Sequence, residues 1–489
     1  MRKKKLLYAC FALFLILRLY GLGTDISNSD ALRWHKRSVN FLMAIKSLDF
    51  KSTYQHYQPG VTLMWIDSIV NQLGFWTQKT LKQTPKTLEN ADYYVIENGV
   101  ATALIVIILF SLLILQSKLI QELWDEKTAI YFAFLMSVEP YLVGIDRWFH
   151  LTSLETYFAL TSILLLLVWK KNGRNRLVVF SAFFLSLSVL SKLTTIVILP
   201  AYIYIFIDRL RRGRNLFSDM MKFVSIFVVA FMFTSVIFFP ALLFDTVHVL
   251  QKLYLAVNGA ISNDLRVWVL PKQIEHVFYF LILLFKLSPV TLLFFILTVL
   301  NVKKLNEKQH LLPLALVLVL YFASLSFTGQ KIDRYAVVMF PYIILLISVY
   351  LSVIKRLGYF AVALSLIFIV YITYLYSPVF SAYYSPLFGG TKMAYKIGIY
   401  DNSGEYYAQS ALFLNTLGRN KNTYVPYNVD SFSPFYKGTT LREYVNNVDF
   451  IVTSVDHLNS EKIVCRDVFK TFGSKVDKIV YVFKCGSSI

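Results

Sequence analysis

The sequence predicts an all-α polytopic membrane protein of about eleven transmembrane helices, followed by a small α/β domain. Of the 489 residues, 56% are hydrophobic and only 16% are charged, which is too little charge to cover a soluble protein of this size. Apolar runs of about twenty residues, the length that a bilayer requires, recur up to residue 376. The net charge of +20 resides mostly in short basic clusters between these runs, which indicates the positive-inside bias and not a nucleic-acid-binding surface.

The first apolar run predicts a retained membrane helix and not a cleaved signal peptide. Residues 2–5 read Arg-Lys-Lys-Lys and place the N-terminus in the cytoplasm. The run over residues 6–22 is long for the core of a signal peptide, and no small-residue cleavage pattern follows it. Arg18 interrupts the run, and we expect its side chain to snorkel to the outer interface.

Residues 24–98 are expected to form a first extracytoplasmic loop. Apolar residues recur at helical spacing over 30–48 and 60–76, but both stretches are short and mixed in polarity. This pattern is typical of helices that lie in the membrane interface and do not cross it.

The remaining predicted crossings alternate in direction up to residue 376. They are residues 99–116, 128–145, 151–169, 177–190, 194–207, 223–244, 288–300, 311–327, 335–353 and 360–376. An interfacial helix over 276–286 before the crossing, or one continuous helix over 274–300, both fit the sequence. On this path the basic clusters all fall on the cytoplasmic side, which supports the assignment.

Residues 1–376 are therefore interpreted as a membrane domain and residues 377–489 as an extracytoplasmic α/β domain. The second part has no further apolar span, a helix-like stretch over 403–417, and strand-like stretches over 422–427, 448–455 and 478–483. Its two cysteines, Cys465 and Cys485, either pair or remain as buried thiols.

Ionisable residues at the predicted outer turns invite a functional interpretation, because charge near a membrane needs a reason. Asp30, just beyond the first helix, is suited to act as a general base that takes a proton from an acceptor hydroxyl. Its spacing also fits a helix N-cap, and from spacing alone the cap is favoured. Glu155 is either a costly buried carboxylate with a partner or a helix-start carboxylate favoured by the dipole.

Four cations at three outer turns are candidates for binding a phosphate or pyrophosphate, because guanidinium and ammonium groups grip such anions. These residues are Arg147, Lys192, Lys331 and Arg334. For each residue alone, interfacial snorkelling or pairing with a nearby aspartate is the simpler explanation. Further candidates for contacting substrate are Arg33, His35, His56 and His150.

Several kinds of site are not indicated by the sequence. No His, Cys and carboxylate set has convincing metal-ligand spacing, and there is no phosphate-cradling Gly-rich loop or nucleotide fingerprint. A nucleotide-dependent enzyme or an ATP-driven pump is therefore not predicted, and no nucleotide cofactor is expected. Whether a divalent metal ion takes part is left open.

A series of short motifs carries a resemblance to a known family. In order they are Ser29-Asp30-Ala31-Leu32-Arg33-Trp34-His35, Tyr57-Gln58-Pro59-Gly60-Val61-Thr62, Asp146-Arg147-Trp148-Phe149-His150-Leu151, Leu190-Ser191-Lys192, Phe239-Pro240-Ala241-Leu242, Phe285-Lys286-Leu287-Ser288-Pro289, Lys331-Ile332-Asp333-Arg334-Tyr335 and Tyr383-Tyr384-Ser385-Pro386. Their order resembles the GT-C-fold membrane glycosyltransferases, in the family 39-like branch of protein O-mannosyltransferases (dolichyl-phosphate-mannose-protein mannosyltransferases) and the lipid A aminoarabinose transferase. The resemblance covers residues 6 to about 395.

The resemblance implies a polyprenyl-phosphate-linked sugar donor, an active site on the outer face and Asp30 as catalytic base. This sequence departs from the family at Gln58, where relatives often have His, and at Thr152, where many have Asp. If that second acid matters, Glu155 is the residue that would have to serve, one helical turn further on.

The function expected from the sequence is transfer of a hexose or pentose from a polyprenyl-phosphate donor to an acceptor hydroxyl, with inversion. The expected location is the cell (plasma or inner) membrane, with a cytoplasmic N-terminus and an extracytoplasmic C-terminal domain. Acceptors on a protein, a lipid or a glycan all fit. The alternatives are a transporter or flippase of lipid-linked sugars, which lacks support from any internal repeat, and a membrane scaffold, which leaves the outer charges unexplained.

Overall fold

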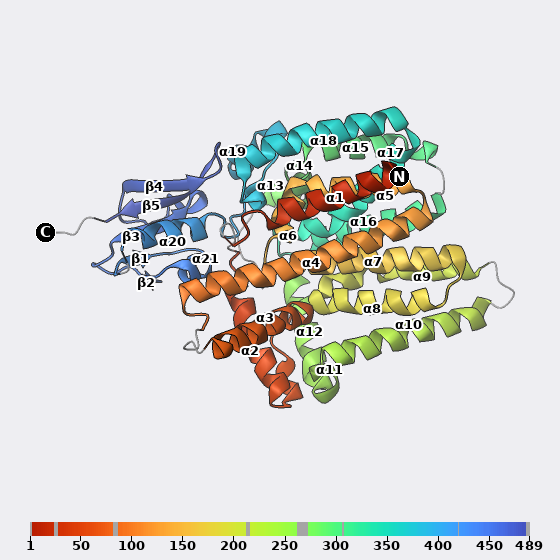
Figure 1. The fold of residues 1–489 in the computed structure, drawn as a ribbon, viewed down its shortest axis with the longest axis horizontal. Coiled ribbons are helices and arrows are strands. Elements are labelled where there is room, and N and C mark those ends of the chain that lie inside the picture. The colour runs from red at the N-terminus through yellow and green to blue at the C-terminus, as the bar shows by residue number, and fades with distance from the viewer. Residues whose placement is uncertain are drawn as a thin grey trace.

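The computed structural model describes residues 2–23, 28–81, 87–211, 216–261, 272–305, 308–418 and 420–485. Long helices run side by side through the body of the molecule, and a small sheet domain sits at one end of them (Figure 1). The fold is therefore the predicted combination of a helical membrane domain and a C-terminal α/β domain. Residues 24–27 and 82–86 of the predicted first loop lie outside the described ranges, as do residues 262–271, which precede the predicted interfacial helix over 276–286.

The helices of the membrane part are α1 Arg2–Leu19, α2 Ala31–Lys46, α3 Val61–Thr80, α4 Ala91–Leu123, α5 Glu126–Val138, α6 Pro140–Asp146, α7 Leu151–Asn172, α8 Arg176–Ser191, α9 Leu199–Leu210, α10 Leu216–Phe238, α11 Ala241–Phe244, α12 Thr246–Ile261, α13 Lys272–Glu275, α14 Phe278–Lys286, α15 Pro289–Leu300, α16 Lys308–Phe327, α17 Phe340–Val353 and α18 Lys355–Tyr376. Short 3-10 helices are η1 Phe50–Thr53, η2 Leu193–Ile198, η3 Val302–Lys304 and η4 Asp333–Met339.

Seven helical segments in the described ranges are long and apolar enough to cross a membrane, or up to nine if each of two bent pairs is one span. The seven are α4, α7, η2 with α9, α10, α16, η4 with α17, and α18. The bent pairs are α5 with α6 and α14 with α15, and α8 is a shorter apolar helix. Every segment predicted to cross is helical, while the count of about eleven crossings stays a prediction.

Both bent pairs break at a polar residue, and the two breaks touch. α5 and α6 meet at 71° at Glu139, and α14 and α15 meet at 119° just before Pro289. The alternative of one continuous helix over 274–300 is therefore wrong, because Pro289 cannot continue the helix hydrogen bonding of α14. The buried Glu139 carboxylate accepts hydrogen bonds from Ser288 N (2.7 Å) and Ser288 Oγ (3.0 Å), which joins the two breaks.

Helix α7 lies at the centre of the bundle, with its most apolar stretch wholly buried by neighbouring helices. It begins where His150 Nδ1 accepts from Thr152 N, and it ends at Gly173, whose positive φ suits a helix C-cap. Its start therefore presents His150 at the sheet end of the bundle.

The expectation that Arg18 snorkels to the interface is wrong. Arg18 is fully buried and pairs with Asp146 at 2.8 Å, while also donating to the carbonyls of Met136 and Ser137. A buried guanidinium needs such a carboxylate and such acceptors, since an unpaired charge in the bundle would be strongly destabilising.

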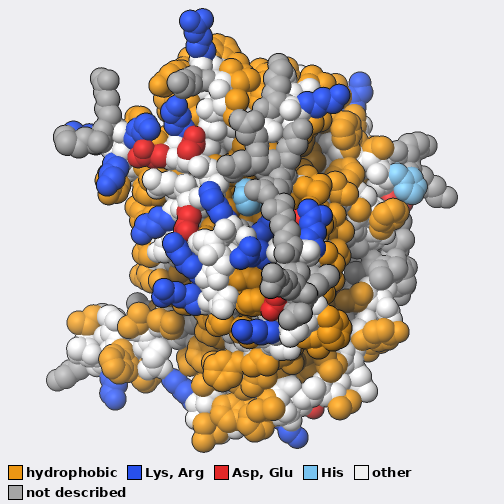
Figure 2. Space-filling view, turned by 90° about the vertical axis from the view of Figure 1, so that its right-hand side faces the viewer, with side chains coloured by type: hydrophobic (Ala, Val, Ile, Leu, Met, Phe, Trp, Pro, Cys, Tyr) orange, Lys and Arg blue, Asp and Glu red, His pale blue; other side chains and the backbone are white. Residues whose placement is uncertain are grey.

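The opposite end of the bundle is rich in Lys and Arg (Figure 2). Exposed basic residues there include Lys118 near the end of α4, Lys171 at the end of α7, Arg174 in the turn that follows and Arg176 at the start of α8. This end corresponds to the side that the sequence assigns to the cytoplasm. Helices α2 and α3 lie instead at the sheet end, and neither is among the helices apolar enough to span.

The C-terminal domain contains a mixed sheet in the order β2-β1-β3-β5-β4. Its elements are η5 Phe380–Ala382, η6 Pro386–Phe388, α19 Gly390–Lys396, α20 Tyr407–Asn415, β1 Asn422–Tyr424, α21 Val429–Phe432, η7 Ser433–Phe435, β2 Thr439–Leu441, β3 Phe450–Ser454, η8 Val455–His457, β4 Asp467–Gly473 and β5 Lys478–Lys484. β1 pairs in parallel with β2 and β3, and β5 pairs antiparallel with β3 and β4.

The sequence anticipates β1, β3 and β5 but not β2 or β4. Strand β4 is an edge strand that leaves Val468 and Phe469 largely exposed, so it lacks the buried alternation that marks a strand. Cys465 and Cys485 form a disulfide, which resolves the alternative that the sequence leaves open. The proposed boundary at residue 376 stays a prediction.

Candidate functional site

A cavity of about 870 Å³ lies between the sheet end of the membrane helices and the C-terminal domain. One wall belongs to the membrane domain and contains Ser29, Asp30, Arg33, Trp34, Arg37, His56, Tyr57, Gln58, His150, Leu151, Lys192, Gln330, Ile332, Arg334 and Tyr335. The facing wall contains Tyr395, Gly398, Tyr400, Asp401, Asn402, Ser403, Tyr427, Asn428, Val429, Asp430, Asp456 and His457. Its size and its mixture of aromatic and charged groups suit a polar ligand with a sizeable organic part.

Asp30 occupies the N-cap position of α2, but its side chain makes no capping hydrogen bond. The carboxylate instead faces the cavity, with Oδ2 at 2.9 Å from Arg334 and 3.6 Å from Nε2 of His150. Burial by itself raises the pKa of this carboxyl, but the hydrogen bond from His150 and the charge of Arg334 hold the pKa well below its usual range. Asp30 is therefore an ionised, oriented carboxylate at neutral pH.

Arg334 connects the two walls of the cavity. It lies in η4, is buried, and donates from Nη2 to Asp30 and from Nη1 to Ser403 Oγ, each at 2.9 Å. Ser29 N also donates to the carbonyl of Ser403 at 3.0 Å. The first loop and the C-terminal domain are thus held together beside the Asp30 carboxylate.

The ring of His150 has a defined orientation and protonation. Its Nδ1 accepts from Thr152 N (3.3 Å), so in the neutral ring the proton resides on Nε2, which faces Asp30. Burial lowers the pKa of His150 to about 4, so the ring is neutral above that pH. A neutral Nε2–H group steadies the Asp30 carboxylate without neutralising its charge.

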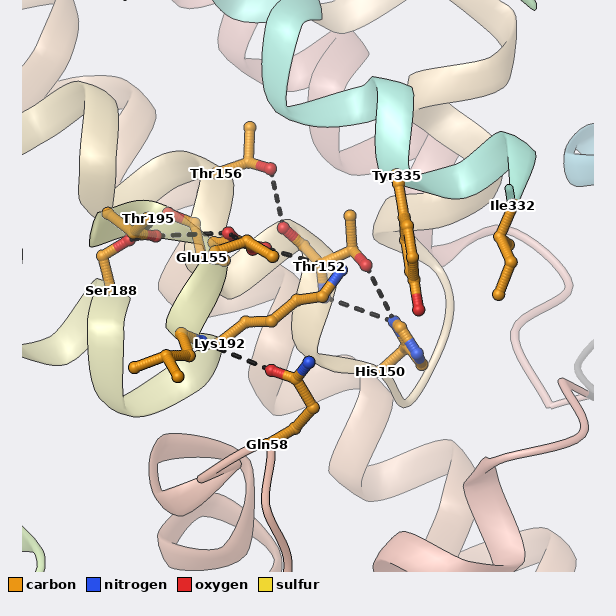
Figure 3. A network of polar contacts seen from close by, with 12 residues as sticks. Gln58, His150, Thr152, Glu155, Thr156, Ser188, Lys192, Thr195, Ile332 and Tyr335 are labelled. Carbon is orange, nitrogen blue, oxygen red and sulfur yellow. Dashed lines mark hydrogen bonds and ion pairs between the residues drawn. The ribbon is translucent and has the colours of Figure 1, made fainter. Parts of the chain in front are cut away.

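Lys192 and Glu155 form a buried pair on the membrane side of the cavity (Figure 3). Lys192 Nζ lies 4.0 Å from Glu155 and 3.5 Å from the centre of the Tyr335 ring. Glu155 also accepts hydrogen bonds from Thr194 and, at 3.2 Å, from Thr195. Lys192 lines the cavity, whereas Glu155 does not, which makes Glu155 the counter-ion behind Lys192.

Two further predicted residues line the same cavity. Arg33 pairs with Asp430 of the opposite wall at 2.9 Å, and Asp430 is also paired with Arg442 at 2.9 Å. The ring of His56 packs edge-on against Trp34, and burial with the nearby Arg37 lowers the pKa of His56 to about 4. Both residues contribute to the cavity wall without touching Asp30.

Besides Glu155, three predicted site residues do not line the cavity. Arg147 donates to the carbonyls of Leu17 (3.0 Å), Arg18 (3.2 Å) and Tyr20 (2.8 Å), where it satisfies the end of α1. Lys331 donates to two carbonyls at the end of α16. His35 points to the other face of α2 and stacks on Phe149 with ring centres 3.9 Å apart.

Sequence reasoning missed Arg37 and the whole facing wall. Arg37 follows Arg33 by four positions, which places both on one face of α2. That spacing was a usable signal. Nothing in the sequence indicates that Ser403 and Asp430, from a separate domain, meet Arg334 and Arg33.

No family model and no curated protein matches the chain. Solved structures do match. Apo ArnT from Cupriavidus metallidurans aligns with a TM-score of 0.59 at 10% identity, over 99% of this chain and 98% of that chain. The same protein bound to undecaprenyl phosphate aligns with a TM-score of 0.55 at 10% identity, over 98% of this chain and 97% of that chain.

The oligosaccharyltransferase of Archaeoglobus fulgidus, tethered with an acceptor peptide, aligns with a TM-score of 0.47 at 11% identity, over 93% of this chain and 69% of that chain. ArnT, a lipid A aminoarabinose transferase, has the GT-C fold and aligns with this chain over almost the full length of both. The chain therefore has the fold of the GT-C membrane glycosyltransferases.

Proposed function

We propose that this protein is an integral membrane glycosyltransferase that moves a sugar from a polyprenyl-phosphate-linked donor to an acceptor hydroxyl in the cavity. The observation that carries the proposal is the ionised Asp30 carboxylate, which faces the cavity beside Arg334 and close to Lys192. A base and two cations beside one polar cavity are what displacement of a phosphate by a hydroxyl requires.

Lys192 and Arg334 are the proposed donor-phosphate ligands. Both line the cavity, and both come from segments at the sheet end of apolar helices, where a lipid-linked phosphate would meet the protein. The solved structure of ArnT with undecaprenyl phosphate supports this class of ligand. Arg37 lines the same cavity and is a third cation available to an anionic donor.

Arg334 gives donor binding a direct effect on Asp30. In the structure its guanidinium donates to Asp30, whereas a bound phosphate would compete for the same N–H groups. When Arg334 turns toward phosphate, Asp30 loses part of the positive field that holds its pKa down. The carboxylate then becomes a stronger base at the moment that the donor is in place.

The proposed reaction is a single displacement with inversion. The acceptor oxygen forms a bond to the anomeric carbon while the bond from that carbon to the phosphate oxygen breaks, and the electron pair leaves with the phosphate. The acceptor proton passes to Asp30, and Lys192 and Arg334 stabilise the departing phosphate. No protein nucleophile is needed, because the phosphate is already a good leaving group.

The reaction is proposed to take place on the outer face of the membrane. The Lys- and Arg-rich end of the bundle lies opposite the cavity, which supports a cytoplasmic location for that end (Figure 2). The Cys465–Cys485 disulfide supports an oxidising compartment for the C-terminal domain. The cavity then opens where a protein, lipid or glycan hydroxyl can reach it.

The test is sugar release from a panel of radiolabelled polyprenyl-phosphate sugars by the purified wild type, Asp30→Asn and Asp49→Asn. Asp49 is an exposed acid of the same loop that does not line the cavity, so it is the matched control. We expect release by the wild type and Asp49→Asn, and a loss of about 100-fold or more in Asp30→Asn. Full activity of Asp30→Asn would contradict the base assignment. Absence of release with transport of the lipid-linked sugar across proteoliposomes would favour a flippase.

A further inference from the structure

A second cluster of ionisable side chains lies away from the cavity, where three helices of the sheet end converge. His35 of α2, Asp67 of α3 and Glu97 of α4 are all buried. One ligand atom of each lies within 4.8 Å of the others. The proposed reaction uses none of these residues, so the cluster needs its own explanation.

The two ring nitrogens of His35 have different surroundings. Nε2 lies 3.0 Å from the amide oxygen of Asn98, an acceptor, which places a proton on Nε2. Nδ1 lies 3.0 Å from Asp67 Oδ1 and faces the two carboxylates. A neutral imidazole held this way presents a lone pair to two carboxylates, which is the arrangement of a metal-binding histidine whose second nitrogen is held by an outer partner.

The charges of the cluster do not balance by themselves. In the described part of the chain, no Lys or Arg forms an ion pair with Asp67 or Glu97. Oδ2 of Asp67 is buried and has no hydrogen-bond partner among the described residues. A carboxylate oxygen removed from water without a partner is costly, and when both acids are ionised beside a neutral histidine, two negative charges are left uncompensated. A divalent cation would neutralise both.

We propose that His35, Asp67 and Glu97 bind a divalent transition-metal ion. One imidazole nitrogen and two carboxylates form a mixed nitrogen and oxygen set, which suits Zn²⁺ or Mn²⁺. Asn98 holds the Nε2–H group, and Phe149 stacks on the ring and fixes its plane. The sequence does not indicate this site, because ligands that are 32 and 30 positions apart form no local metal-ligand motif.

The ion would have a structural role outside the reaction. It would tie α2 and α3 to α4, and α2 is the helix that carries Asp30 at its start and Trp34 and Arg37 on its cavity face. Fixing the buried face of α2 fixes the direction in which its other face points. Loss of the metal should therefore loosen the cavity wall without removing any group from it.

The competing occupant is a proton. Burial lowers the pKa of His35, but the charge of Asp67, the hydrogen bonds to Asp67 and Asn98 and the charge of Glu97 together raise the pKa overall, so a protonated ring donating to Asp67 is the alternative state. The two states differ in metal content, which makes the distinction measurable.

The experiment uses full-length protein purified in detergent, from which the affinity tag has been removed. The protein is then equilibrated with Zn²⁺ or Mn²⁺ and desalted. Elemental analysis of the wild type should give about one ion per chain. Asp67→Asn and Glu97→Gln should reduce the content at least tenfold. Glu122→Gln changes an acid at the far end of α4 that pairs with Arg174, and it should leave the content unchanged.

Thermal unfolding of the wild type provides a readout that needs no variant. A chelator should lower Tm, and adding back Zn²⁺ or Mn²⁺ should restore it. X-ray absorption should show nitrogen and oxygen ligands without sulfur. The proposal would be overturned if the wild type retained far less than one ion per chain and its Tm changed with neither chelator nor metal. The cluster would then hold a proton in place of a metal ion. Metal retained by both acid variants would overturn the choice of ligands.

Discussion

Asp30 and Arg334 are 304 positions apart in the chain, yet a carboxylate oxygen of one lies 2.9 Å from a guanidinium nitrogen of the other. The contact joins the start of the first loop to the segment that begins the helix pair η4–α17. Together with the hydrogen bond from His150, the charge of Arg334 lowers the pKa of the proposed base. The first of four predictions tests this contact, and the other three test other parts of the site and the C-terminal domain.

The first prediction concerns the acid limb of the pH–rate profile. Burial raises the pKa of Asp30, but the hydrogen bond from His150 and the charge of Arg334 hold it below its ordinary value of 3.8, so wild-type activity should not fall through protonation of Asp30 until the pH is below that value. Arg334→Gln removes that charge, so the pKa rises and activity, relative to its own maximum, should be lost about one pH unit higher.

The matched control for this change is Arg442→Gln, which removes an arginine that pairs with Asp430 and does not touch Asp30. Its acid limb should overlay that of the wild type. Identical acid limbs for all three proteins would show that Arg334 does not set the pKa of the base.

The second prediction separates the roles of Lys192 and Glu155. Lys192→Met should abolish donor binding and also lower Tm, because it leaves the Glu155 carboxylate buried without its cation. The double variant Lys192→Met/Glu155→Gln should recover most of the lost stability but none of the activity. Thermal unfolding and sugar release from the donor, measured on the same preparations, distinguish the loss of stability from the loss of activity. Recovery of activity in the double variant would exclude Lys192 as a phosphate ligand.

The third prediction concerns the contact between the two walls. Asp430 pairs with both Arg33 and Arg442, whose side chains are 57% and 69% exposed. Since exposed pairs contribute little, Arg33→Ala should change the free energy of unfolding by less than about 1 kcal/mol. Asp430→Ala should lower the free energy of unfolding by more than Arg33→Ala does, because it leaves two arginines without their shared carboxylate.

Arg442→Ala is the internal comparison, since it breaks only the pair that lies within the C-terminal domain. If contact between the walls shapes the cavity, Arg33→Ala should raise KM for the acceptor while Arg442→Ala leaves it unchanged. Equal KM values for the two variants would mean that this contact does not affect acceptor binding.

The fourth prediction concerns the Cys465–Cys485 disulfide. It closes a loop of 20 residues, for which chain entropy gives about 3 kcal/mol of stabilisation of the domain. A Cys465→Ser/Cys485→Ser variant should therefore lose protease resistance in the C-terminal domain at lower denaturant concentration. The comparison is best made in a Cys10→Ala background, where no free thiol remains to exchange. Unchanged resistance would show that the disulfide does not limit domain unfolding.

Much of the fold was predictable because hydrophobic run length and the distribution of basic residues act locally along the chain. The break at Glu139 was not, since it depends on a polar partner on a distant helix, and the break at Ser288 was one of two alternatives that the sequence left open. Asp30, Lys192 and Arg334 were identified because charges at outer turns need partners, and these three do line one cavity.

Other site predictions failed for reasons that the geometry makes plain. His35 follows Arg33 by two positions, which on a helix points it to nearly the opposite face, away from the cavity. Lys331 and Arg147 were expected at the same turns as true cavity residues, but nearby helix ends offered them unsatisfied carbonyls. The sequence alone does not say which of two neighbouring cations turns toward the cavity.

The turn over residues 146–150 makes contacts at both ends. At its start, Asp146 and Arg147 hold the end of α1, and at its finish His150 faces the Asp30 carboxylate. The turn therefore fixes the distance between the end of α1 and the proposed base. A residue inserted in this turn would move the contacts with α1 relative to the contact between His150 and Asp30. An insertion in the exposed turn over 172–175 would move neither. The length of this short turn, more than its composition, determines the position of His150, and with it the contact to Asp30, relative to the end of α1.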